Sequence, residues 1–289
     1  MTAARNIWAA ALLIAAGCAP AARHGPAAAD LLADVKSIAP GQPFTVAVSL
    51  KPDRGWHLYW SNPGDSGLAP EVTWDLPPGF TAGEIQRPFP EAIASPPFMT
   101  YGHEGEVLYL FTITPPNDLP PGNVTLAANV EWLVCKDACL PGEARLEQVL
   151  PVSAGPAQAH GRHAAKIAAA RRRLPADPAG WRFAATLENG RYRVIATSPG
   201  ATAIASAFFF PYEPNVIRHA APQTWRREDA RYILELEPAQ PSASPPAQLA
   251  GVLVTKGSWL AGDPVRAIRI EAPFSGNESQ SPNPERNQP

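Results

Sequence analysis

Charge is scarce in this sequence, and that scarcity excludes one class of partner. Charged residues make up 17% of the 289 residues, and the formal net charge is -2. A nucleic-acid-binding protein presents a basic surface, and this balance offers none. The sequence also has no Ser/His/Asp constellation, phosphate loop or paired-carboxylate signature. Nothing therefore supports hydrolase or kinase chemistry.

Long apolar runs are also scarce. The one clear run, "IWAAALLIAA" from Ile7 to Ala16, follows Arg5 and is too short to span a bilayer in a mature protein. It is typical of an export signal. "AAGC", which ends at Cys18, resembles a bacterial lipobox, whose cysteine is lipidated and becomes the mature N-terminus. We predict that residues 1–18 are a lipoprotein-type signal peptide. The alternative is an ordinary secretory signal cleaved at "APA" (19–21).

Cysteine is the third shortage, with three in the chain. Cys18 is either lipidated or removed with the signal, so Cys135 and Cys139 remain as a pair in an oxidising compartment.

Proline, by contrast, is abundant: there are 35, about twice the usual ~5% share. Proline and glycine clusters separate short apolar runs. In "FTVAVSL" (44–50), apolar Phe44, Val46, Val48 and Leu50 alternate with smaller or polar residues, which predicts a half-buried strand. Several such runs at this spacing favour a β-sandwich.

The composition of the chain changes near residue 155. An alanine-rich segment predicts a helix that ends before Pro175, and a second series of short strands without cysteine follows it. We therefore predict an all-β chain of two sandwiches joined by a short helical linker. The predicted boundaries are 28–154 for the first sandwich, 155–178 for the linker, 179–273 for the second sandwich and 274–289 for a disordered tail.

The spacing of Cys135 and Cys139 predicts a turn or a single helical turn. In an extended strand these residues would lie about 13 Å apart, whereas a disulfide needs Cα atoms roughly 4.4–6.8 Å apart. The strand must therefore end near Val134. A bridge across so short a loop removes little chain entropy, so redox exchange is favoured over a structural staple, and metal binding stays open. Lys136 beside Cys135 favours a thiolate, whereas Asp137 opposes it.

Four segments resemble the N-terminal periplasmic domain of DsbD-type protein-disulfide reductases. They are "GWHLYWSNPGDSGLAPEVTWDLPPGF", "RPFPE", "YGHEGEV" and "VEWLVCKDACLPGEARLEQVLPV". The closer likeness is to the ScsB-type branch, which has a two-sandwich N-terminal region. The resemblance is strong over Leu31–Val152 and weak over Trp181–Ala272.

The resemblance implies immunoglobulin-like sandwiches and a redox-active pair, with Cys139 attacking the partner and Cys135 resolving the adduct. It places Tyr59 beside the cysteines.

The family also shields its cysteines with a cap loop. The resemblance assigns the apolar cap to Phe98 or Met99, and Tyr101 to the aromatic-Gly pair that ends the loop. Two features depart from the best-known members: Thr100 replaces their phenylalanine, and the cysteine spacing is shorter.

The expected function is thiol–disulfide exchange, as a protein-disulfide reductase component that needs no cofactor. The expected partners are periplasmic thioredoxin-like disulfide proteins and a separate membrane electron donor, since this sequence carries no transmembrane or thioredoxin-like module. The expected location is the periplasm, with a lipid anchor for which the outer membrane is favoured.

Two alternatives stay open. Cys135 and Cys139 with Met99 and His103, and with His57 nearby, form a soft ligand set that suits Cu(I). The second alternative is a non-enzymatic immunoglobulin-like interaction module with a structural disulfide. Four tryptophans then form either an exposed ligand face or, more typically for strands, the sandwich core. They are Trp56, Trp60, Trp74 and Trp132.

Overall fold

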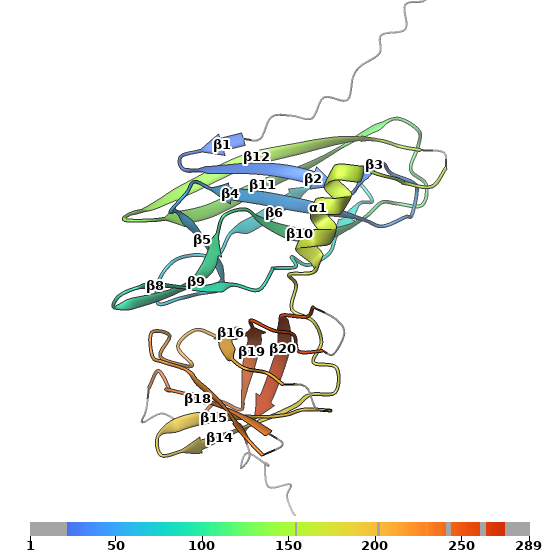
Figure 1. Cartoon of the computed structure of the whole chain (residues 1–289). Helices are drawn as coiled ribbons and strands as arrows, with labels where there is room; N and C mark the ends of the chain where they lie inside the picture. Colours follow the sequence, from blue (N-terminus) through green and yellow to red (C-terminus); the bar gives the residue numbers. More distant parts are fainter. Residues whose placement is uncertain are drawn as a thin grey trace, which may run out of the picture.

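The computed structural model describes residues 22–153, 155–200, 203–229, 231–240, 244–260 and 264–274. The predicted signal peptide with Cys18 and residues 275–289 of the predicted tail lie outside the described residues. Within the described ranges, every regular element but one is a β-strand, which confirms the predicted all-β fold. Figure 1 shows two β domains, one above the other, with a single helix beside the upper one.

The first sandwich packs two sheets face to face. The five-stranded sheet has the order β1-β2-β4-β10-β7, and the six-stranded sheet has the order β12-β11-β5-β9-β8, with β6 also paired to β11. The strands of the first sheet are β1 (Ala22–His24), β2 (Ala27–Ala33), β4 (Phe44–Pro52), β10 (Val107–Thr114) and β7 (Thr81–Ala82). Those of the second are β12 (Cys139–Pro151), β11 (Asn123–Cys135), β5 (His57–Gly64), β9 (Phe98–Glu104), β8 (Glu91–Ser95) and β6 (Glu71–Asp75). A small pair, β3 (Val35–Ser37) and β13 (Gln158–Ala159), lies beside them.

The core of this sandwich follows from the period-two pattern. Val46, Val48 and Leu50 of β4 are fully buried between the sheets, where they face alternate residues of β11 such as Val130 and Trp132. Side chains of one strand alternate between its two faces, so one face of each strand fills the core.

The predicted half-burial of β4 is wrong, because its other face is covered as well. The single helix α1 (Gly161–Arg171) lays Ile167 and Ala170 against Ala47 of β4 and against Leu108 of β10. The predicted linker helix therefore also completes the packing of the first sandwich. No helix among the described residues has the length and apolar character needed to cross a membrane.

The second domain is a smaller sandwich of a four-stranded and a three-stranded sheet, with strand orders β14-β15-β18-β17 and β16-β19-β20. Its strands are β14 (Arg182–Glu188), β15 (Arg191–Thr197), β16 (Ala207–Pro211), β17 (Thr224–Glu228), β18 (Arg231–Leu236), β19 (Gln248–Thr255) and β20 (Ala267–Pro273). Phe274, which sequence places at the start of the tail, is buried in this core.

An apolar cluster joins the two sandwiches. Trp60 and Tyr101 of the first sandwich pack with Phe210 of the second, at ring-centroid distances of 6.3 and 4.9 Å. Trp60 also stacks on Tyr212 at 5.6 Å. Trp60 therefore belongs to the interdomain contact, whereas Trp132 lies in the core of the first sandwich.

Candidate functional site: the disulfide hairpin

Cys135 and Cys139 end and begin the two strands of a long hairpin. β11 ends at Cys135, β12 begins at Cys139, and the two residues are direct partners in the register. They form a disulfide, with Cα atoms 4.2 Å apart. The amide of Lys136 donates to the carbonyl of Ala138 at 3.2 Å and closes the turn. The turn that sequence predicted from the cysteine spacing is present.

The two sulfurs differ in access. Cys135 is 2% exposed, whereas Cys139 lies on the exposed side of the hairpin. Thiol–disulfide exchange requires a thiolate to reach one sulfur directly. This difference makes Cys139 the residue that a partner can reach.

Tyr59 contacts both sulfurs. Its hydroxyl lies 2.8 Å from Cys135 Sγ, to which it donates, and 3.4 Å from Cys139 Sγ. The strand that carries it, β5, pairs with β11 through Leu58–Val134 and His57–Cys135, so the phenol ends beside the bridge. Burial raises the pKa of Tyr59, so the hydroxyl keeps its proton at neutral pH and stays a donor.

His57 is a neighbour that sequence reasoning weighed only as a metal ligand. It pairs with Cys135 on one side and with Glu104 on the other, and its ring meets the ring of Tyr59 edge-on at 5.3 Å. Burial lowers the pKa of His57, and the charge of Glu104 offsets part of that effect. The ring beside the disulfide is therefore uncharged at neutral pH.

The loop between β5 and β6 covers Tyr59, and we call residues 65–70 the cover loop. Gly67 has φ +116°, and a Cβ at this position would overlap the ring of Tyr59. A glycine is needed here both for the backbone angle and for the close approach. The sequence by itself does not indicate that this loop contacts Tyr59.

The second sandwich holds the cover loop. Asn62, which lies just before it, donates through Nδ2 to the carbonyls of Pro211 at 2.9 Å and Glu213 at 3.2 Å. Asp65 within the loop meets His219 at 3.2 Å between Oδ1 and Nδ1. A chain of contacts therefore runs from the second sandwich through the cover loop and Tyr59 to the sulfurs.

The three residues expected in the cap loop differ in their surroundings. Phe98 lies at the tip of the β8–β9 hairpin and is 55% exposed. Met99 packs against the interdomain cluster, and its amide donates to Asp65 Oδ2 at 2.7 Å. The ring of Tyr101 is fully buried against Phe210. Within the described ranges, no hydrogen bond or ring contact joins these three side chains to the cysteines.

Lys136 lies exposed in the hairpin turn, with its methylene chain against Gly55.

Of the alternative copper ligands, His57 lies beside Cys135, whereas His103 lies in a different row of side chains. Leu58 of β5 pairs with both Val134 and His103, and these alternate positions face the core, whereas Cys135 lies in the row of His57 and Glu104. His103 is buried near Tyr109, and burial lowers its pKa to about 3. The described residues contain no group of three or more His, Cys, Asp or Glu that could hold a metal ion.

The fold and site together define a two-sandwich protein with a half-exposed disulfide at the end of a hairpin. Residues 28–151 match the family model described as "Thiol:disulfide interchange protein DsbD, N-terminal". The chain therefore contains a DsbD-type N-terminal domain, as its sequence segments indicated.

One solved structure supports the fold. The chain resembles the crystal structure of the N-terminal periplasmic domain of ScsB from Proteus mirabilis with a TM-score of 0.62 and 15% identity. The likeness covers 86% of this chain and 94% of that one. A protein of unknown function from Porphyromonas gingivalis W83 is 12% identical over 86% of this chain and 100% of that chain, with a TM-score of 0.27 that is too low to indicate a shared fold. No curated protein matches the sequence.

Proposed function

We propose that this protein exchanges thiols and disulfides in the periplasm through Cys139 and Cys135. The observation that carries the proposal is the bridge between an exposed and a buried cysteine, with the hydroxyl of Tyr59 within hydrogen-bonding distance of both sulfurs. The match of residues 28–151 to the DsbD N-terminal family supports the same chemistry.

The reaction starts from the reduced pair. The Cys139 thiolate attacks one sulfur of a partner disulfide, a mixed disulfide forms, and the other partner sulfur leaves as a thiolate. The Cys135 thiolate then attacks Cys139 Sγ, which forms the intramolecular bridge and releases the second partner sulfur. The partner gains two electrons and this protein loses two. Tyr59 stabilises the reacting thiolate, since a hydrogen bond to the charged form favours it.

The partners that fit this role are periplasmic thioredoxin-like disulfide proteins, which receive the electrons, and a separate membrane reductase, which restores the thiols. The periplasmic origin of the ScsB domain and the N-terminal signal pattern support this location. A lipid on Cys18 would hold the protein at a membrane, with the outer membrane favoured. The two sandwiches at 28–154 and 179–273 and the linker at 155–178 are the units that we propose. Cu(I) binding remains the alternative, but the positions of Met99 and His103 do not favour it.

Trapping tests the proposal. Each purified single variant, Cys135→Ala and Cys139→Ala, is mixed with an oxidised thioredoxin-like protein, and intact mass is measured without reductant. Cys135→Ala should accumulate a mixed disulfide because nothing resolves the adduct on Cys139. Cys139→Ala should accumulate far less, because Cys135 is buried. Absence of an adduct from both variants, with no reoxidation of the reduced parent protein, would reject exchange and leave a structural bridge.

A further inference from the structure

A groove on the outer face of the six-stranded sheet leads to the disulfide. Residues two apart on a strand share a face, and the register of β6, β11 and β12 places three rows of side chains side by side. The disulfide is the first row, an apolar pair is the second, and three carboxylates are the third. These rows are Cys135–Cys139, Leu133–Pro141 and Glu71–Glu131–Glu143.

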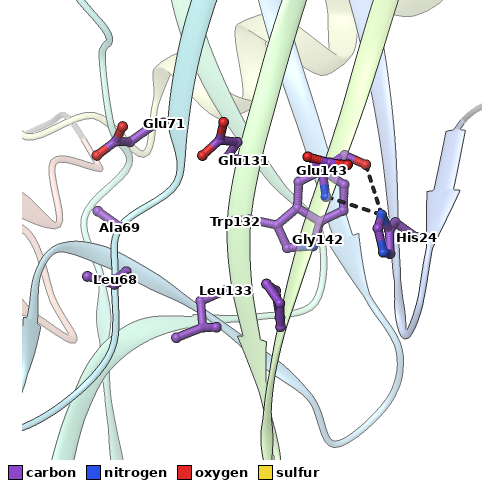
Figure 2. A pocket seen from close by; sticks show the side chains of 10 residues that line it. His24, Leu68, Ala69, Glu71, Glu131, Trp132, Leu133, Gly142 and Glu143 are labelled. Carbon is purple, nitrogen blue, oxygen red and sulfur yellow. Dashed lines mark hydrogen bonds between the residues drawn. The ribbon is translucent and has the colours of Figure 1, made fainter.

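The second and third rows line a cavity of about 580 Å³, which Figure 2 shows from close by. Leu68 and Ala69 of the cover loop form its wall on the β6 side, and the ring of His24 lies at the opposite end. Leu68 is 69% exposed, so a large apolar side chain stands at the rim with little to pack against. The groove is apolar next to the disulfide and acidic at its far end.

The acidic row is unfavourable in the isolated protein. Glu131 pairs directly with Glu71 on one side and with Glu143 on the other, and like charges opposite each other across strands are destabilising. Within the described ranges, none of the three carboxylates makes an ion pair.

The nearby cations are engaged elsewhere. Arg87 interacts electrostatically with Glu71 but forms no ion pair with it, and its guanidinium donates to the carbonyl of Pro70 at 3.3 Å. Arg145, in the next row, pairs with Asp75 at 2.8 Å and with Glu147 at 3.2 Å. A cation supplied from outside would relieve the repulsion along the acidic row.

We infer that this groove receives an extended segment of the redox partner that carries a lysine or arginine about 13 Å from its reactive cysteine, the length of four strand residues. An apolar side chain of that segment lies between them, over Leu133 and Pro141. This inference rests on the proposed exchange at Cys139 and adds the charge of the partner that the site selects. The acidic row and the disulfide share one face, so a single segment can contact both.

Synthetic peptides provide the test. Each carries one cysteine linked to thionitrobenzoate and, at the matching distance, either lysine, glutamine or glutamate. The reduced protein attacks the peptide disulfide through Cys139, and the rate is followed by the release of coloured thiol. The lysine peptide should react about two- to fivefold faster than the glutamine peptide, as an exposed ion pair allows. The glutamate peptide should be slower than both.

The preference should disappear in the double variant Glu131→Gln/Glu143→Gln, and in about 1 M salt, where the Debye length is about 3 Å. The control is Glu84→Gln/Asp118→Asn, which removes two exposed carboxylates of the first sandwich outside the groove and should keep the preference. Equal rates for the three peptides would overturn the groove and leave exchange intact. The same holds if both double variants lose the preference equally. Absence of reaction with every peptide would overturn exchange itself.

Discussion

Replacing Tyr59 with phenylalanine should make the thiolate form of Cys139 less stable relative to the thiol, without disturbing the packing of the site. The hydroxyl lies 3.4 Å from Cys139 Sγ, and its hydrogen-bond partners within the described ranges are the two sulfurs. Phenylalanine keeps the ring that packs against Gly67. A hydrogen bond to a charged group contributes about 1.5–3 kcal/mol. Because Cys139 is exposed and the distance is long, we use the lower end, which corresponds to about one pH unit.

The effect on rate is smaller than the effect on ionisation. At neutral pH the thiolate fraction should fall about tenfold. A more basic thiolate is also a better nucleophile, with a Brønsted coefficient of about 0.4–0.5, which recovers about threefold. The net rate of alkylation should therefore fall about threefold at neutral pH and rise about threefold on the alkaline plateau.

The assay is the pH dependence of Cys139 alkylation in a Cys135→Ala background, where one thiol reacts. Tyr59→Phe should move the midpoint up by about one pH unit. The matched control is Tyr101→Phe, which removes another buried hydroxyl whose oxygen has no partner within the described ranges. It should leave the midpoint in place. An unmoved midpoint in Tyr59→Phe, with an unchanged melting curve, would refute the role of the phenol.

Four further outcomes follow from the same contacts. Reducing the disulfide should cost at most about 2 kcal/mol in urea unfolding, because the bridge closes a very short loop, and a much larger loss would identify a structural staple. Asn62→Ala should lower unfolding free energy by about 1–3 kcal/mol, since two carbonyls of the second sandwich lose their donor, and should expose the cover loop to limited proteolysis. The pKa of His103 is lowered in the folded state, so between about pH 6.5 and 3 the unfolded chain binds a proton at this residue and the folded chain does not. The free energy of unfolding should therefore fall as the pH drops through this range. His103→Leu should reduce the slope of that fall by about 1.4 kcal/mol per pH unit. Mass spectrometry of the membrane fraction should find an acylated mature N-terminus at Cys18, and Cys18→Ala should release the protein; an unlipidated N-terminus at Ala22 would contradict this.

The disulfide turn was predictable from sequence because it depends on local geometry. Two cysteines four residues apart cannot bridge within a strand, so the chain must leave the extended conformation at Lys136 and its neighbours. The β4 strand and the alanine-rich helix were predictable for the same reason, since each depends on a side-chain pattern among residues close together in sequence.

The surroundings of the disulfide were decided by tertiary structure. Sequence resemblance assigned Tyr101 to the end of the cap loop, and the structure packs its ring on Phe210, more than a hundred residues away in sequence. The second sandwich contacts the strand end before the cover loop through a hydrogen bond from Asn62 to the carbonyl of Pro211. These two residues are 149 positions apart. No local pattern encodes such pairs, because they form only when two surfaces that are distant in sequence meet.

The acidic row has the same origin. Glu71, Glu131 and Glu143 are unremarkable exposed residues of three separate strands, and nothing in their spacing along the chain relates them. Strand register sets them side by side and aligns them with the cysteines, since a shift of one residue in any pairing would turn a carboxylate to the other face. Sequence determined the cysteine pair and the strands that carry it, whereas strand pairing and domain contact determined what surrounds that pair.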